Sequence, residues 1–249
     1  MKYGTISISL KNRKMDADEE KRVGRMSLRQ KIKEGLVIPS FSFPPIKTCN
    51  LEVVLQNGEC GCGGCYALYM RKSAMDSWQM NLDAWVNDPV RVKEDLMRFV
   101  QEYRPKFFRF FVAGDIPDQG FLMSMVYVAL CCSGTDFMFF TKQWDYVNSL
   151  YENMNALKTV HWPGNLHPVF SNGVNVRARN PFHFPESRIL FPWEAVEVEK
   201  GTICGGNCYE CNVSENGCWF MEKGQTVLLP VHGAGKGKFS TSKGKRESL

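Results

Sequence analysis

Four cysteines in a glycine-rich stretch form the first candidate site: Cys49, Cys60, Cys62 and Cys65. Glycines precede and separate the last three, and glycine adopts the left-handed backbone conformations that let a chain wrap closely around a ligand. Clustered thiolates bind zinc or iron–sulfur clusters. The irregular spacing contains one C-x-x-C and lacks the two close pairs of a structural zinc site, so it favours an iron–sulfur cluster, with zinc as the alternative.

A second cysteine group lies near the C-terminus and comprises Cys204, Cys208, Cys211 and Cys218. Four thiols within 15 residues predict a second metal centre. This spacing suits zinc as well as an iron–sulfur cluster, and it leaves open whether both groups share one centre. By contrast, Cys131 and Cys132 end an apolar helix and are expected to be core thiols.

The compartment bears on how these thiols are used. No stretch of the 249 residues is long and apolar enough for a transmembrane helix, and the N-terminal residues lack the apolar core of a signal peptide. We therefore expect a cytoplasmic protein that contacts no membrane, located in the host cytoplasm if the protein is viral. Cytoplasmic thiols stay reduced, which favours metal binding over disulfides.

The hydrophobic pattern predicts an α/β fold. Strongly apolar strands alternate with helices along the chain. The strands are expected at 36–43, 107–114, 136–141, 166–173 and 187–193, and the helices at 65–86, 89–103, 121–132 and 143–157. Such strands indicate a parallel sheet covered on both faces. Too few units are present for a complete eight-stranded barrel, so a partial (βα) barrel or an open doubly wound sheet is expected.

Four segments divide the chain in this interpretation. Residues 1–35 form a basic N-terminal helical extension with a helix at 16–34, and residues 36–200 form the α/β partial barrel. Residues 201–235 form a cysteine-rich metal-binding segment packed on the barrel, and residues 236–249 form a disordered basic tail.

Positive charge is concentrated at the two ends of the chain. The net charge is +5 at pH 7, and the first 35 residues and the last 14 each carry an excess of Lys and Arg. Basic ends can hold the phosphate backbone of a nucleic acid, or they can simply be a solvated helix and tail.

Polar residues follow the predicted strands where a parallel fold places its working loops. Gly114 and Asp115 end the strand at 107–114, and the Cys49 loop follows the strand at 36–43. The Asp115 carboxylate suits an ammonium group, or it caps the next helix.

Several stretches resemble a known family: SFSFPPIKTC, CGGCYA, RFFVAGDIPDQGFLMSMVYVAL, FMFFTKQWDYVN and a late VHG. Over roughly residues 36–235 the chain is similar to the phage gene product 88 family, which resembles a compact radical SAM-type barrel. The resemblance implies an N-terminal [4Fe–4S] cluster. It also places Gly114 and Asp115 where radical SAM enzymes bind the amino group of S-adenosylmethionine (SAM).

Three functions remain open at this point. The first is an iron–sulfur protein on a radical SAM-like barrel, acting as a SAM-dependent radical enzyme on an unknown substrate. The second is a non-catalytic iron–sulfur protein with structural or redox clusters. The third is a zinc-stabilised protein that binds nucleic acid through its basic termini.

Overall fold

The computed structural model describes residues 1–12, 23–50, 65–158, 160–173, 176–190, 201–205 and 217–230. Four predicted metal ligands lie outside the described residues: Cys60, Cys62, Cys208 and Cys211. The basic tail also lies outside them. Of the two cysteine groups, the structure therefore describes Cys49, Cys65, Cys204 and Cys218.

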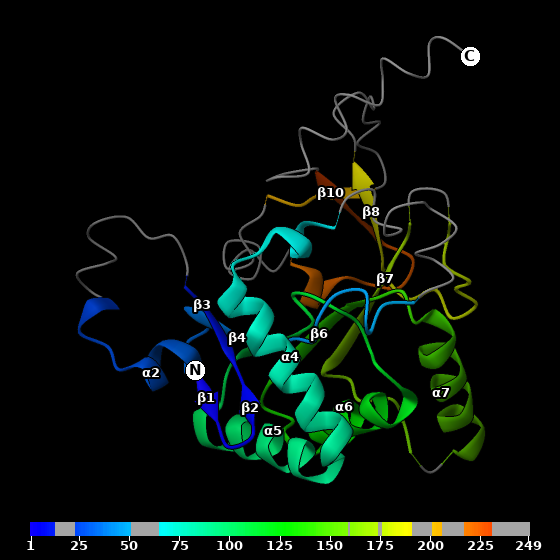
Figure 1. Cartoon of the computed structure of the whole chain (residues 1–249). Helices are drawn as coiled ribbons and strands as arrows, with labels where there is room; N and C mark the ends of the chain where they lie inside the picture. Colours follow the sequence, from blue (N-terminus) through cyan, green and yellow to red (C-terminus); the bar gives the residue numbers. More distant parts are fainter. Residues whose placement is uncertain are drawn as a thin grey trace.

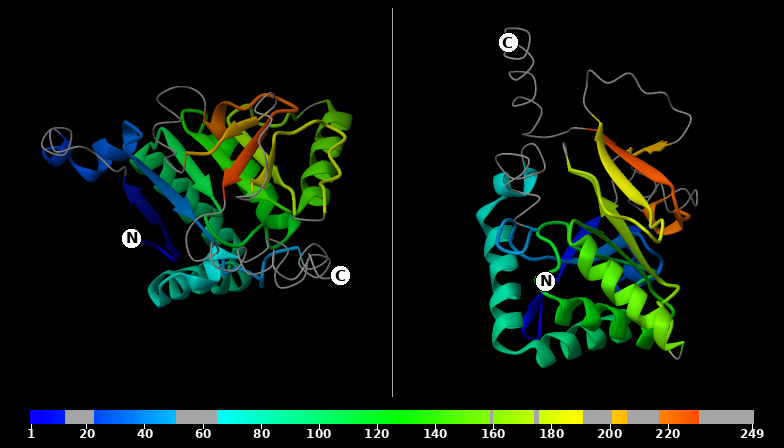
Figure 2. Two further views of the ribbon diagram at one scale, coloured as in Figure 1. Left: turned by 90° about the horizontal axis from the view of Figure 1, so that it is seen from above. Right: turned by 90° about the vertical axis from the view of Figure 1, so that its right-hand side faces the viewer.

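The fold is built on an eight-stranded sheet in the order β3-β4-β5-β6-β7-β8-β10-β9 (Figure 1). All neighbouring pairs are parallel except β3 with β4. The strands are β3 Ser9–Asn12, β4 Val37–Phe41, β5 Phe107–Phe110, β6 Asp136–Thr141, β7 Leu166–Ser171, β8 Glu186–Leu190, β9 Gly201–Ile203 and β10 Thr226–Pro230. The N-terminal strands (blue) and the last strands (yellow to red) lie at opposite ends of the sheet (Figure 2). A mixed α/β fold with a mostly parallel sheet is thus confirmed.

Five helices of the described chain accompany the sheet: α2 Leu28–Lys33, α4 Lys72–Asn87, α5 Pro89–Tyr103, α6 Gln119–Cys131 and α7 Trp144–Leu157. The predicted helices at 89–103, 121–132 and 143–157 are confirmed by α5, α6 and α7. Their boundaries follow local chemistry. Pro89 opens α5, where a missing N–H costs little, and Asp118 caps α6 by accepting a bond of 2.8 Å from the Phe121 N–H. None of the helices in the described ranges is long and apolar enough to cross a membrane.

An aromatic core joins one face of the sheet to α4, α5, α6 and α7. Phe108 and Phe110 of β5 and Phe137 and Phe139 of β6 are fully buried in this cluster. Their alternate spacing puts them on the same face of the strands. The Phe110 and Phe137 rings stack with their centroids 5.8 Å apart. These four helices therefore cover one face of the sheet.

The intervening residues of the same strands face a second, smaller cluster. Phe107, Met138 and Val169 pack there with Trp219 of the short helix η3 (Cys218–Phe220). The Trp219 indole N–H donates to the Asp136 carbonyl oxygen at 3.1 Å. In the described part of the chain, the face opposite the four helices is thus covered by a C-terminal segment.

The prediction of an N-terminal helical extension was wrong for the first 12 residues, which form strands. β1 (Lys2–Tyr3) and β2 (Ile6–Ser7) make a hairpin, and β3 then joins the main sheet. Of the predicted helix at 16–34, residues 23 and 24 are helical and α2 covers Leu28–Lys33, with a break between them. The signal for strands was the alternation in Ile6-Ser7-Ile8-Ser9, which buries both isoleucines.

Two buried polar side chains hold the hairpin on the helices. Asp95 of α5 accepts from the backbone N–H and the hydroxyl of Thr5, at 2.7 and 2.8 Å. Asn81 of α4 accepts from the Ser7 N–H at 2.7 Å and donates to the Ser7 and Ser42 carbonyl oxygens, at 3.1 and 2.9 Å. Such interactions depend on residues distant in sequence, so the hydrophobic pattern could not reveal them.

The predicted helix at 65–86 is interrupted near its start. A short 3-10 helix, η1 (Tyr66–Tyr69), follows Cys65, and α4 begins only at Lys72. Met70 has extended backbone angles (φ −74°, ψ 159°) and so breaks the helix. The helix that was predicted to begin at Cys65 therefore begins only at Lys72.

Candidate functional site

The loops that follow β4, β5 and β6 meet at the carboxyl edge of the sheet, and the Asp115 carboxylate joins two of them. Its Oδ1 accepts from the Thr141 hydroxyl at 2.6 Å and from the Ile116 N–H at 2.8 Å. Its Oδ2 accepts from the Lys142 N–H at 2.7 Å. Hydrogen bonds to an ionised acceptor are among the stronger ones in proteins, so this side chain fixes the loop after β5 to that after β6.

Thr48 brings in the third loop. The backbone N–H of Asp115 donates to the Thr48 hydroxyl at 3.0 Å, and this hydroxyl donates to the Pro44 carbonyl oxygen at 3.2 Å. The neighbouring Asn50 donates from Nδ2 to the Lys142 carbonyl oxygen at 3.0 Å. The loop after β4, which carries Cys49, is thereby tied to both others.

Gly114 is required by the close approach of these loops. Its φ of +71° lies in the left-handed region that side chains disfavour. A Cβ at this position would lie 2.5 Å from the Phe43 carbonyl oxygen and 2.7 Å from Thr48 Oγ1. Any larger residue would push the loop after β5 away from the loop after β4.

Burial sets the protonation of Asp115. The residue is 4% exposed, and desolvation raises the pKa of its carboxyl to about 6. The hydrogen bonds from Thr141, Lys142 and Ile116 act in the opposite direction, because they stabilise the ionised form. The carboxyl therefore changes charge near neutral pH.

Of the two roles of Asp115 weighed from the sequence, the structure contradicts that of a helix cap. Asp118, and not Asp115, caps α6, and its other carboxylate oxygen accepts from the Trp85 indole N–H at 2.7 Å. The Asp115 oxygens already accept three bonds within the protein. Its geometry is that of a residue that positions loops, and binding of a SAM ammonium group by Asp115 stays a prediction.

Cys49 and Cys65, the outer cysteines of the first group, lie beside residues that contact the loop after β5 or pack against it. Cys49 adjoins Thr48, which bonds to Asp115, and the Ile46 N–H donates to Cys49 Sγ at 3.3 Å. Cys65 packs against a small apolar cluster that contains Ala113. The structure thus brings the two ends of the cysteine-rich stretch to the same loop.

Cys204 and Cys218, of the second group, pack against a different cluster. Both are partly buried against the apolar residues around Trp219, on the face opposite the helices. The backbone N–H of Cys204 donates to the Leu228 carbonyl oxygen at 2.8 Å. Within the described ranges no three His, Cys, Asp or Glu residues gather as a complete metal site. Each group has only two of its four cysteines in those ranges.

The prediction for Cys131 and Cys132 was half right. Cys132 is buried with 9% exposure, and burial raises the pKa of its thiol to about 11. Cys131 is exposed at the end of α6.

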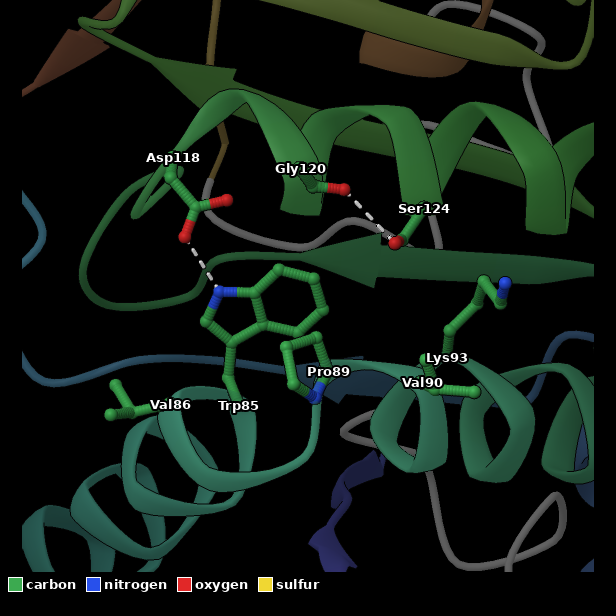
Figure 3. Close-up of a pocket in the computed structure, with 8 residues that line it drawn as sticks. All are labelled: Trp85, Val86, Pro89, Val90, Lys93, Asp118, Gly120 and Ser124. Carbon is green, nitrogen blue, oxygen red and sulfur yellow. Dashed lines mark hydrogen bonds between the residues drawn. The ribbon is translucent and has the colours of Figure 1, made fainter.

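A pocket of about 430 Å³ lies on the helical side of the molecule (Figure 3). Its lining consists of Trp85, Val86, Pro89, Val90, Lys93, Asp118, Gly120 and Ser124. This lining offers apolar surface and contains no cysteine, so the pocket is not part of the predicted metal sites.

A family model described as Gene product 88 matches residues 8–224. The chain belongs to the phage gene product 88 family. The match covers both cysteine groups and the Asp115 loop. No curated protein and no solved structure matches the chain.

The pKa of Asp115 predicts how Asp115→Asn should behave. Because the folded pKa lies above the unfolded value of 3.8, folding favours the protonated form. The stability that this group contributes is complete below pH 3.8 and is lost as the pH rises through about 6. The wild type should therefore lose about 2 kcal/mol of stability relative to Asp115→Asn between pH 4 and pH 7.5, measured by urea unfolding.

Thr141→Val provides an independent check of the same assignment. The Thr141 hydroxyl lowers the Asp115 pKa, so its removal should move the loss of stability to higher pH. A stability difference between wild type and Asp115→Asn that does not vary with pH would contradict the assignment.

Proposed function

We propose that the protein holds a [4Fe–4S] cluster at the carboxyl edge of its sheet, ligated by Cys49, Cys65 and at least one of Cys60 and Cys62. One observation carries the proposal: the loop after β5 contacts the chain at both ends of the cysteine-rich stretch. Thr48, beside Cys49, bonds to Asp115 of this loop, and Cys65 packs with Ala113. The two described ends of the stretch that contains Cys60 and Cys62 are thus held near the same loop.

The donor set fits such a cluster. Thiolates are the usual ligands of iron–sulfur clusters, and N–H···S hydrogen bonds tune their potential. The Ile46 N–H already donates to Cys49 Sγ at 3.3 Å. When bound, the cluster would supply one-electron chemistry, and the protein would position the reacting groups.

The arrangement of the sheet supports a radical SAM-like interpretation. The parallel strands β4 to β8 follow one another in sequence order, and α4 to α7 pack on one face. A (βα) barrel is wound in this way, whereas a doubly wound sheet carries helices on both faces. Three cysteine ligands would leave one iron free to bind SAM. Gly114 and Asp115 would hold the loops beside it.

Arg109 favours an enzyme over a non-catalytic iron–sulfur protein. It is paired in register with Met138, and its guanidinium lies over the Phe140 ring, 5.2 Å from the centroid. Phe140 is two residues nearer the carboxyl end of β6 than Met138. Among the described residues, the buried Nε of Arg109 has no hydrogen-bond partner. This side chain therefore offers a positive charge to an anionic group, such as the SAM carboxylate.

Loss of a first-group ligand should empty the cluster site. We expect Cys49→Ala, purified anaerobically, to lose iron and the brown colour of iron–sulfur proteins relative to wild type. Cys131→Ala is the matched control, because this exposed thiol lies at the far end of α6. Full iron content in Cys49→Ala would contradict the proposed ligand set, and a colourless wild type containing stoichiometric zinc would favour the zinc-stabilised alternative.

SAM titration of the reduced protein separates the two iron–sulfur alternatives. The wild type should bind SAM, and Arg109→Gln should bind it about 10- to 150-fold more weakly, the equivalent of a charged hydrogen bond of about 1.5–3 kcal/mol. Arg91→Gln, an exposed change on α5, should bind SAM like the wild type. If the reduced wild type with a full cluster binds no SAM, the protein is a non-catalytic iron–sulfur protein.

The second cysteine group is proposed to hold a separate centre. Metal binding would offset the entropy lost on ordering this polar segment, so Cys204→Ala/Cys218→Ala should lose metal and melt at a lower temperature. The first centre should keep its iron. If the same double variant also empties the first centre, the two groups share one site; if it retains all its metal, the second group is no site.

A further inference from the structure

A second pocket, of about 280 Å³, lies between two segments that are far apart in the sequence. Around α2, Ser27, Arg29, Gln30 and Lys33 line it, and Tyr103 and Arg104 complete it from the end of α5. The lining thus contains three cationic side chains, one aromatic ring and no acidic residue. We refer to it as the basic pocket.

The elements that carry these side chains are anchored to the body of the protein. Ile32 of α2 is fully buried, and its carbonyl oxygen accepts from the Lys106 N–H at 3.4 Å, next to β5. Ser27 caps α2 by accepting from the Gln30 N–H at 3.2 Å. The Tyr103 ring stacks on Phe99 with centroids 4.7 Å apart. The charged side chains of the basic pocket are therefore carried by backbone elements that are anchored to the rest of the protein.

Among the described residues, the cations of the basic pocket have no acidic partner. Arg29, Lys33 and Arg104 are exposed, and none of them forms an ion pair within the described part of the chain. Between the two basic ends the chain carries more acidic than basic residues. The positive charge is therefore concentrated locally, and the pocket is not simply one part of a uniformly basic protein surface.

Its position separates the basic pocket from the proposed cluster. α2 precedes β4 and Arg104 precedes β5, so the pocket lies at the amino ends of these parallel strands. Cys49 and Asp115 follow the carboxyl ends of the same strands. A ligand in the basic pocket would therefore leave the opposite edge of the sheet free.

We propose that the basic pocket binds the phosphate backbone of a single-stranded nucleic acid. Lys and Arg side chains around one pocket can neutralise successive phosphates of a strand. The guanidinium of an arginine can also donate two parallel hydrogen bonds to the oxygens of one phosphate. Sequence-tolerant sites for single strands combine such cations with aromatic rings that contact bases, a role that Tyr103 fills. This inference is independent of the proposed cluster.

Salt-dependent binding tests the inference. Full-length holoprotein is titrated, by fluorescence anisotropy, into a labelled DNA strand of about 20 nucleotides, longer than the site of a single binding fold. Arg29→Gln/Lys33→Gln/Arg104→Gln should weaken binding at low salt at least tenfold. It should also reduce the slope of log K against log salt by about 2, because each phosphate contact with a single strand contributes about 0.7.

Lys158→Gln is the matched control for the charge at Arg104. Both residues end a helix in the left-handed conformation, with φ of +46° at Arg104 and +55° at Lys158, but only Arg104 lines the basic pocket. The control should bind the strand like the wild type. If the triple variant folds poorly, Arg29→Gln/Lys33→Gln, confined to exposed positions on α2, should reduce the slope by about 1.4.

Three results would overturn the inference. The first is unchanged affinity and slope in a folded variant of the basic pocket. The second is equal weakening by Lys158→Gln, which would indicate attraction by net charge alone. The third is displacement of the strand by equimolar inorganic phosphate, which would indicate a site for free phosphate.

Discussion

The buried carboxylate of Asp115 is the interaction on which the proposed site depends. It is held by donors from Thr141, Lys142 and its own loop, and its backbone N–H reaches Thr48. Through its side chain and its backbone N–H, this one residue thereby links the loops after three neighbouring strands. Since Cys49 lies on one of these loops and Cys65 packs against another, the positions of these two cysteines depend on Asp115.

The two faces of the sheet pack against different elements, and its two edges carry different kinds of residues. The face with the large aromatic core is buried under four helices and supplies most of the apolar packing. The opposite face carries Arg109 and is covered near Asp136 by Trp219. The carboxyl edge gathers polar loops, whereas the amino edge bears the basic pocket. Because parallel strands share one direction, groups that follow the strands and groups that precede them are kept apart.

Much of the fold could be predicted from the sequence, because apolar strands and amphipathic helices leave strong periodic patterns. The location of Gly114 and Asp115 after the carboxyl end of β5 was predicted in the same way, although β5 ends at Phe110. The function of Asp115 as a connector was not predictable, because its partner Thr141 is 26 residues away and is chosen by register between strands. The hairpin was missed because its partners, Asn81 and Asp95, lie on helices much later in the chain.

The attachment of the hairpin has a consequence for synthesis. Thr5 bonds to Asp95, a separation of 90 residues, and Ser7 bonds to Asn81. The hairpin is synthesised before α4 and α5 and therefore has no docking site until they have been made. At about 5–20 residues per second, this delay is on the order of 5–20 s. During this time the hairpin lacks its contacts with Asn81 and Asp95, and an undocked strand edge is open to pairing with another chain.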